Sequence, residues 1–214
     1  MLKRIIFDVD NTLIQWKDEY YKKINKPFEE LKISYTKEDL LNVVKAIDNY
    51  EKNYEYFNIY SLQEMFCHTL NKKLPENFTN IVLKYFKTCV PDKLPQKEID
   101  TLTYLQQKYD LVVLTNWFKD VQIERLKKVG IYDCFKEIYA TEKIKMKPNP
   151  ESFQTAMGEQ KPEECVMVGD NLKQDIQGAL NCGIPAIYIT LDKKANENKL
   201  YKTIHDLTEL KKIL

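Results

Sequence analysis

Histidine is scarce in this chain of 214 residues: there are two, His68 and His205, and each stands alone in the sequence. A metal centre built on imidazole ligands and a Ser-His-Asp triad both need histidine near other functional side chains, so the sequence argues against both. The five cysteines are odd in number and include no C-x-x-C pair. This pattern argues against a disulfide framework and against a zinc knuckle.

Long apolar runs are also absent. The first apolar run, residues 5–7, is interrupted by Asp8, which makes it too short for a signal peptide, and no run has the length that a bilayer span requires. Net charge is +1, from 33 basic and 32 acidic residues, so no general surface for nucleic acid or anionic membranes is indicated. We therefore expect a cytoplasmic protein with no nucleic-acid or membrane partner, and the oligomeric state is left open.

What the chain does contain is enough apolar material for a sizeable core, since 43% of its residues are hydrophobic. Short apolar runs that predict buried strands occur at residues 5–7, 111–114, 137–140, 166–168 and 186–189. Helical patterns lie between and after them, at residues 96–108, 119–129, 151–157, 172–181 and 207–214. This alternation predicts an α/β fold with a doubly wound, mostly parallel sheet.

A block of helical character interrupts that alternation after the first strand. Thr36 followed by Asp39 predicts a helix N-terminus, and apolar residues at helical spacing follow from 40 to 54. We expect residues 15–92 to form a helical cap, and residues 1–14 and 93–214 to form the α/β catalytic core. The cap is rich in aromatic side chains, which either pack the helices together or grip an organic substrate.

Two acids directly follow the first strand. Extended geometry would place Asp8 and Asp10 on one side of the chain, where two like charges need a cation or a shared proton. The alternative is a strand followed by an ordinary polar turn. Thr115 and Asp170 follow later strands in the same way, and parallel sheets bind ligands at the carboxyl ends of their strands. We therefore expect these side chains to converge on one cleft.

With these residues in place, the sequence resembles the haloacid dehalogenase-like superfamily over nearly its whole length. The segment 8–12, DVDNT, is similar to the first motif of that family, D-x-D-x-T, and Thr115 after its strand is similar to the second. The segment 147–150, KPNP, is similar to the lysine-bearing third motif, and Gly169-Asp170 through Asp175 to the fourth, G-D-x-x-x-x-D. The helical block between the first two motifs is similar to the cap of the subgroup with phosphoglycolate phosphatase and β-phosphoglucomutase.

The resemblance implies a phosphatase that works through an aspartyl-phosphate intermediate. It implies that Asp8 is the nucleophile, Asp10 the general acid and base, and Thr115 and Lys147 the remaining catalytic residues. Phosphate would be held by Asp8, Thr115, the Asn116 backbone amide and Lys147. Mg²⁺ would be held by Asp8, the Asp10 carbonyl and Asp170, with Asp175 either as a further ligand or as a residue that supports the ligands, since oxygen ligands suit a hard cation. Without the resemblance, Asp175 would be read as an acid favoured by the dipole at a helix N-terminus.

Other functions stay open at this point. A phosphomutase would use Asp8 and Asp10 in the same way, and a phospho-accepting receiver module or a silent binding protein would come from another class. A dehalogenase is disfavoured, because that activity needs no acid at position 10. Trp117, where many members of the family have a small residue, either narrows the phosphate mouth or packs the following helix. The substrate is not predicted: sugar phosphates, phosphoglycolate and nucleoside monophosphates all fit.

Overall fold

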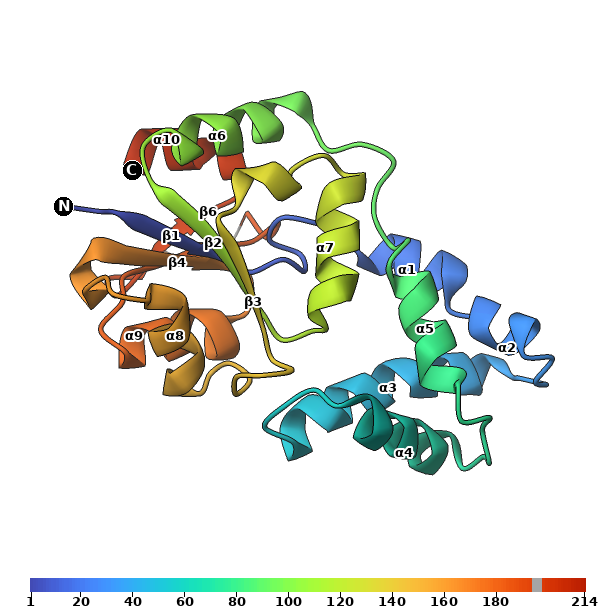
Figure 1. Cartoon of the computed structure of the whole chain (residues 1–214). Coiled ribbons are helices and arrows are strands. Elements are labelled where there is room, and N and C mark those ends of the chain that lie inside the picture. Colours follow the sequence, from blue (N-terminus) through green and yellow to red (C-terminus); the bar gives the residue numbers. More distant parts are fainter. Residues whose placement is uncertain (194–197) are drawn as a thin grey trace.

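A six-stranded parallel sheet forms the centre of the computed structural model, which describes residues 1–193 and 198–214 (Figure 1). The strands are β1 (Arg4–Phe7), β2 (Asp110–Thr115), β3 (Glu137–Ala140), β4 (Cys165–Gly169), β5 (Ala186–Ile189) and β6 (Lys202–Ile204). Their order in the sheet is β3-β2-β1-β4-β5-β6, and every neighbouring pair is parallel. The predicted doubly wound α/β fold is confirmed.

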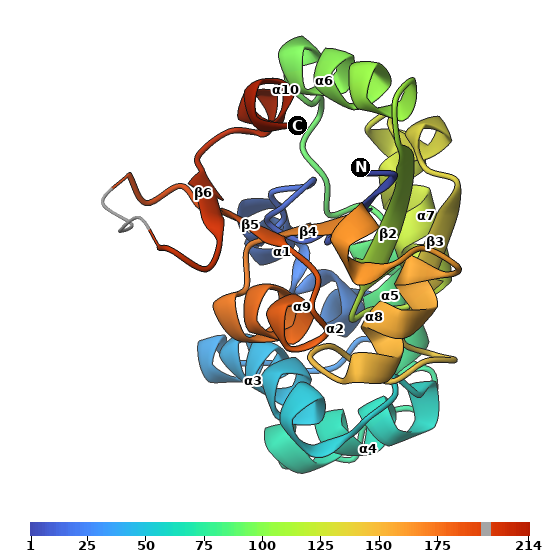
Figure 2. The same ribbon diagram turned by 90° about the vertical axis from the view of Figure 1, so that its left-hand side faces the viewer.

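Helices cover both faces of this sheet, as Figures 1 and 2 show. They are α6 (Gln96–Gln106), α7 (Lys119–Lys128), α8 (Pro150–Met157), α9 (Gly178–Asn181) and α10 (Leu210–Ile213). Alternate residues of β1 enter different cores: Ile5 and Phe7 pack with Leu102 of α6, whereas Ile6 packs with Phe153 of α8. Because both faces are covered, the central strands read as continuous apolar runs rather than as alternating ones.

Three elements differ from the sequence expectation. Strand β6 was not predicted, because its sequence KTI is mostly polar and only its last residue, Ile204, is buried. The predicted helix over 172–181 divides into a π-helical segment, Leu172–Gln177, and the short α9. The C-terminal helix begins with a 3₁₀ turn, Leu207–Glu209, before α10.

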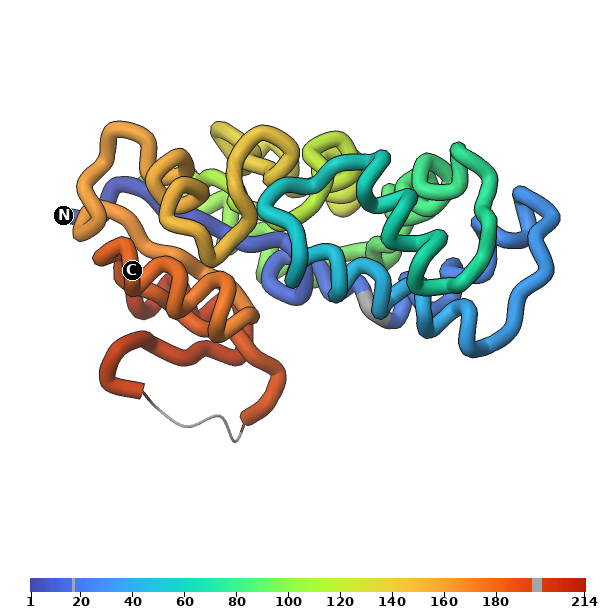
Figure 3. The backbone as a smooth tube through the Cα atoms, turned by 90° about the horizontal axis from the view of Figure 1, so that it is seen from below, coloured from blue at the N-terminus to red at the C-terminus, as the bar shows by residue number. Residues whose placement is uncertain are grey.

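Five of the six helices between β1 and β2, all those before α6, form a second layer, which we call the helical insertion. They are α1 (Lys17–Lys23), α2 (Lys26–Glu30), α3 (Lys37–Asn53), α4 (Ile59–Leu70) and α5 (Phe78–Phe86). They lie at one end of an elongated molecule, beyond the carboxyl ends of the strands (Figures 1 and 3). The predicted N-terminus of α3 is confirmed: the Thr36 hydroxyl accepts from the Asp39 amide, and the Asp39 carboxylate accepts from the Thr36 amide.

The insertion and the sheet layer share an apolar cluster. Trp117, Phe118 and Met146 come from loops at the sheet edge, yet they are buried among side chains of the insertion. The Trp117 ring lies 4.9 Å from the ring of Phe57 and 5.0 Å from that of Phe86. Trp117 therefore packs against the insertion, and many of the aromatic side chains there serve packing. Within the described residues, no helix has the length and apolarity to cross a membrane.

Candidate active site

The chain turns sharply where β1 ends, and the turn presents two carboxylates. The Asp8 amide donates to the Val168 carbonyl at 3.0 Å, which extends the pairing with β4 by one residue. The Val9 carbonyl then accepts from the amides of residues 12–14, and Asn11 adopts a left-handed φ of 61°. Asparagine tolerates that conformation better than most residues. Asp8 and Asp10 consequently lie at the carboxyl edge of the sheet.

Lys147 is the centre of a buried network at this edge. Its ammonium donates to Asp8 Oδ1 at 2.6 Å, to Asp175 Oδ1 at 2.7 Å and to the Leu114 carbonyl at 2.9 Å, which uses all three of its donors. The side chain is 1% exposed. Burial acts to lower the pKa of Lys147, but the carboxylates of Asp175 and Asp8 raise it well above its ordinary value. The network therefore holds a permanent positive charge beside Asp8.

The backbone of Lys147 is held by a side chain whose part was not predicted. The Asn116 carboxamide donates from Nδ2 to the Lys147 carbonyl at 3.0 Å and accepts from the Lys147 amide at 2.7 Å. This pair of bonds joins the loop after β2 to the loop that carries the lysine. The side chain of Asn116 thus fixes Lys147, while its backbone amide belongs to the predicted phosphate site.

The spacing of the fourth motif has a steric reason. Asp175 lies in the π-helical segment, and its Oδ2 accepts from the Asn171 amide at 3.0 Å while its Oδ1 faces Lys147. A Cβ atom on Gly169 would come within 2.4 Å of the Asp175 carboxyl group. Only glycine at the end of β4 therefore lets the Asp175 carboxylate approach the sheet edge.

Three carboxylates form a candidate metal site. Ligand oxygens of Asp8, Asp170 and Asp175 all lie within 4.8 Å of one another. Burial, together with the neighbouring carboxylates, raises the pKa of Asp8 well above its ordinary value despite the opposing effect of Lys147. Burial and the charge of Asp175 raise the pKa of Asp170 to about 6. Oxygen donors crowded in this way match the preference of a hard divalent cation.

Asp10 belongs to a second network, which sequence reasoning missed. Its Oδ1 accepts from Arg125 Nη1 at 2.7 Å, and its Oδ2 accepts from Gln122 Nε2 at 2.8 Å. Gln122 Nε2 also donates to the hydroxyl of Thr115 at 2.9 Å. Gln122 and Arg125 are three residues apart on α7, so they share one face of that helix. The signal that could have pointed to Gln122 and Arg125 is the presence of two long polar side chains on the buried face of one helix.

Glu51 approaches the site from the helical insertion. Its Oε2 accepts from Gln174 Nε2 at 2.8 Å, which connects the end of α3 to the π-helical segment. Burial raises the pKa of Glu51 to about 6, while the hydrogen bond from Gln174 and the charge of Lys147 act to lower it. No sequence pattern distinguishes Glu51 from the other acids of this helix.

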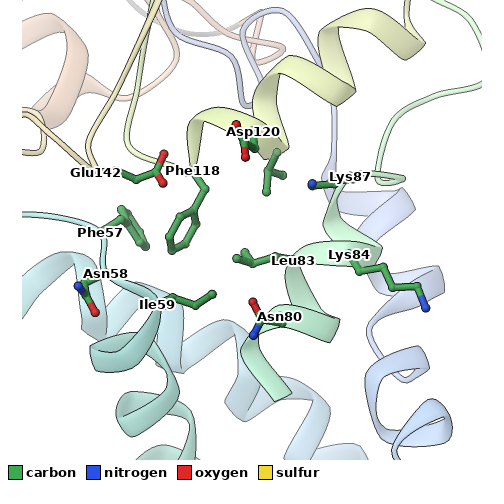
Figure 4. A pocket seen from close by; sticks show the side chains of 11 residues that line it. Phe57, Asn58, Ile59, Asn80, Leu83, Lys84, Lys87, Phe118, Asp120 and Glu142 are labelled. Atoms are coloured by element: carbon green, nitrogen blue, oxygen red, sulfur yellow. The ribbon is translucent and has the colours of Figure 1, made fainter. Parts of the chain in front are cut away.

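A separate cleft of about 530 Å³ lies where the insertion meets α7 (Figure 4). Its lining includes Phe57, Asn80, Phe118, Asp120 and Glu142, and none of the predicted catalytic side chains. We therefore place the candidate chemistry at the sheet edge and not in this cleft.

The predicted site residues all lie at the carboxyl edge of the sheet, in two adjoining groups. Asp8, Lys147 and Asp175 are joined by direct hydrogen bonds, and Asp170 lies within ligand distance of the two acids. Asp10 and Thr115 are joined through Gln122, and the side chain of Asn116 holds the backbone of Lys147.

Comparisons with known proteins agree with this architecture. Residues 5–189 match the family model of haloacid dehalogenase-like hydrolases. The glyceraldehyde 3-phosphate phosphatase of Methanothermobacter thermautotrophicus is 27% identical over 228 residues, covering 100% of both chains. The pyrimidine 5'-nucleotidase YjjG of Escherichia coli is 26% identical over 225 residues, covering 98% of this chain and 96% of its own.

Among solved structures, the putative hydrolase YfnB of Bacillus subtilis, bound to magnesium, superposes with a TM-score of 0.81. The superposition covers 100% of this chain and 98% of that one, at 22% identity, and it supports the fold. The enzyme class predicted above, a phosphatase, is confirmed by the named activities of the curated relatives.

Proposed function

The chain belongs to the haloacid dehalogenase-like hydrolase family, and on that premise we propose that it is a Mg²⁺-dependent phosphohydrolase of small phosphorylated metabolites. The observation that carries the proposal is the buried contact of Lys147 with Asp8 inside a group of three carboxylates. A phosphoryl group binding there meets a nucleophile, a fixed positive charge and a cation site within one small volume. Phosphoryl transfer depends mainly on such positioning and charge stabilisation.

The cation would be held by Asp8, the Asp10 carbonyl and Asp170. Both oxygens of Asp175 already accept hydrogen bonds, from Lys147 and from the Asn171 amide. Asp175 would therefore orient Lys147 beside the metal site, and the second lone pair on each of its oxygens leaves it available as a ligand as well. When bound, Mg²⁺ neutralises phosphate oxygens and the crowded carboxylates.

The chemistry would proceed in two steps. Asp8 has its Oδ1 held by Lys147, and its Oδ2 would attack phosphorus and form an aspartyl-phosphate while the bond to the leaving oxygen breaks. Asp10 would give a proton to that leaving oxygen and then take one from the water that attacks the phosphoenzyme. The Thr115 hydroxyl, the Asn116 backbone amide and Lys147 would hold the phosphoryl oxygens.

The helical insertion would act as a cap that selects the substrate, with boundaries near residues 15 and 92. Its α3 helix brings Glu51 to the π-helical segment that carries Asp175, so the insertion contacts the motif loops directly. A carboxylate at that place favours substrates with hydrogen-bond donors, such as sugar hydroxyls, over substrates with a second acidic group. The phosphatases among the relatives act on small phosphorylated compounds, which supports this substrate class.

The test is phosphate release from p-nitrophenyl phosphate and from a panel of sugar phosphates, nucleoside monophosphates and phosphoglycolate. We expect activity with Mg²⁺, none after exhaustive chelation, and recovery when Mg²⁺ is added back. Rapid quenching should trap phosphate on Asp8, and an Asp8→Asn variant serves as the control. Activity that is equal before and after chelation would contradict the role of the cation, and phosphate trapped on another residue would contradict the role of Asp8.

A further inference from the structure

Arginine is rare in this chain: among 33 basic residues only Arg4 and Arg125 are arginines. Arg125 is on α7, and its side chain is 1% exposed. An arginine is seldom buried this far without a paired acid, because its charge cannot be removed by deprotonation. The acid that it meets is Asp10, which is 115 residues away in sequence.

The contacts of Arg125 and Gln122 fix the Asp10 carboxylate at both oxygens. Arg125 holds Oδ1 at 2.7 Å and Gln122 holds Oδ2 at 2.8 Å, and the two are joined by a bond of 2.7 Å from Arg125 Nη1 to Gln122 Oε1. Two donors on two different oxygens define the plane of a carboxylate, whereas a single donor would leave it free to rotate. Each oxygen keeps a second lone pair for a proton.

The same two side chains tie this carboxylate to its surroundings. Gln122 donates to the hydroxyl of Thr115, which the proposed function places on the phosphate. Arg125 Nε donates to the Cys89 carbonyl at 3.2 Å, in the segment that leaves the helical insertion. Its Nη2 is buried and has no hydrogen-bond partner among the described residues. The Arg125 guanidinium is thus held at Nε by the Cys89 carbonyl and donates from Nη1 to Asp10, an arrangement that can keep the Asp10 carboxylate in one orientation.

We propose that Arg125 and Gln122 are positioning residues that hold the Asp10 carboxyl group in the orientation for proton transfer to the leaving oxygen. The inference rests on the proposed function, in which Asp10 is the general acid. Neither residue touches the phosphoryl group in this role. Both act through Asp10, and Gln122 also acts through Thr115.

The role predicts a dependence on the leaving group. General-acid catalysis contributes on the order of 10²- to 10⁴-fold, and it matters least when the leaving group is already a stable anion. The experiment measures kcat and KM for a series of aryl phosphates, from 2,4-dinitrophenyl phosphate to phenyl phosphate. Arg125→Met should lower kcat for phenyl phosphate by about 100-fold and kcat for the dinitrophenyl ester by less than about 10-fold.

Two further variants separate positioning from folding. Gln122→Met removes no charge, and it should steepen the leaving-group dependence in the same way while also raising KM, because Thr115 loses its donor. Arg125→Lys restores one charged donor and should recover part of kcat for phenyl phosphate. If Arg125→Met does not fold, the Gln122→Met result decides the question.

Arg4→Met is the matched control. Arg4 donates to the carbonyls of Ala156 and Met157 and lies 3.5 Å from the Asp110 carboxylate, at the opposite end of β1. Its loss should lower thermal stability and leave the leaving-group dependence unchanged.

Equal losses for every ester in Arg125→Met and Gln122→Met would overturn the positioning role, provided that Asp10→Asn itself steepens the dependence. A wild-type protein that hydrolyses no aryl phosphate would overturn the proposed function, and this inference with it.

Discussion

Charged side chains are arranged in opposite ways at the sheet edge and in the helical insertion. At the sheet edge Lys147, Asp175 and Arg125 are each 1% exposed, and each faces a partner of opposite charge. In the insertion, ion pairs such as Lys84 with Glu30 lie on the surface, at 58% and 31% exposure, and apolar packing holds the helices. Buried charges depend on their partners far more than exposed ones do. We therefore expect substitution of a charged residue to be far more damaging in the buried ion pairs of the sheet edge than in the exposed ion pairs of the helical insertion.

The largest expected effect is the loss of activity in Asp8→Asn. A carboxamide cannot act as the nucleophile, so kcat should fall by about 10⁴-fold or more. The free energy of unfolding should change little, because asparagine fits the same space and Lys147 keeps Asp175. Steady-state kinetics and urea unfolding of the same preparation measure both quantities. Retained turnover in a properly folded variant would rule out Asp8 as the nucleophile.

Lys147→Met should damage both stability and activity. It leaves Asp8 and Asp175 buried without their cation, and removal of one partner from a buried ion pair typically costs about 3–5 kcal/mol. Lys84→Met is the matched control in the insertion, where we expect little change in unfolding. The comparison would fail if the two variants showed similar urea midpoints.

Gly169→Ala tests the steric reason for the fourth motif. The added methyl would overlap the Asp175 carboxyl group, so the side chain must shift and Lys147 loses one acceptor. We expect a loss of about 1–3 kcal/mol in stability and a clear drop in kcat. Gly130→Ala is a useful control, because nothing lies within 4 Å of its Cβ position, although its φ of 77° adds local strain. Near-normal kcat in Gly169→Ala would show that Asp175 can act from another position.

The smallest effect concerns the pH dependence of Glu51, which accepts a hydrogen bond from Gln174 and is influenced by the charges of Lys147, Asp48 and Asp10. Since burial raises its pKa from 4.5 to about 6 in the folded protein, folding is favoured by the protonated acid. Stability from this group is therefore fully present below pH 4.5 and is lost as the pH rises through about 6. Glu51→Gln should remove that part of the pH dependence, of order 1 kcal/mol after allowance for solvent screening. Identical pH profiles of thermal unfolding in the two proteins would contradict it.

Much of the sheet could be predicted because its central strands are buried on both faces. The predicted strands at 5–7, 111–114 and 166–168 lie within the central strands β1, β2 and β4. Strand β6 could not be found in this way, since an edge strand with one buried residue carries no apolar run. The division of 172–181 into a π-helical segment and α9 was not predicted, and the contact that Asp175 of this segment makes with Lys147 is not contained in the local sequence.

The residues of the candidate site that belong to a sequence motif could be predicted, whereas those that reach the site from helix α7 could not. Asp8, Thr115, Lys147 and Asp170 follow strands or occupy loops that position them at the sheet edge. Arg125 instead reaches Asp10 from the middle of α7, across 115 residues of sequence. Such a contact depends on how α7 packs on the sheet edge, so it could be recognised only in three dimensions.

The burial of Trp117, Phe118 and Met146 in the helical insertion has a consequence for protein engineering. Chimeras that exchange caps between relatives would treat residues 15–92 as an interchangeable module. In this protein, loops of the α/β core contribute side chains to the apolar interior of the helical insertion. A transplanted cap would therefore have to pack against core side chains that fit a different set of helices. A working exchange would have to transfer the loops around positions 117 and 146 together with the helices.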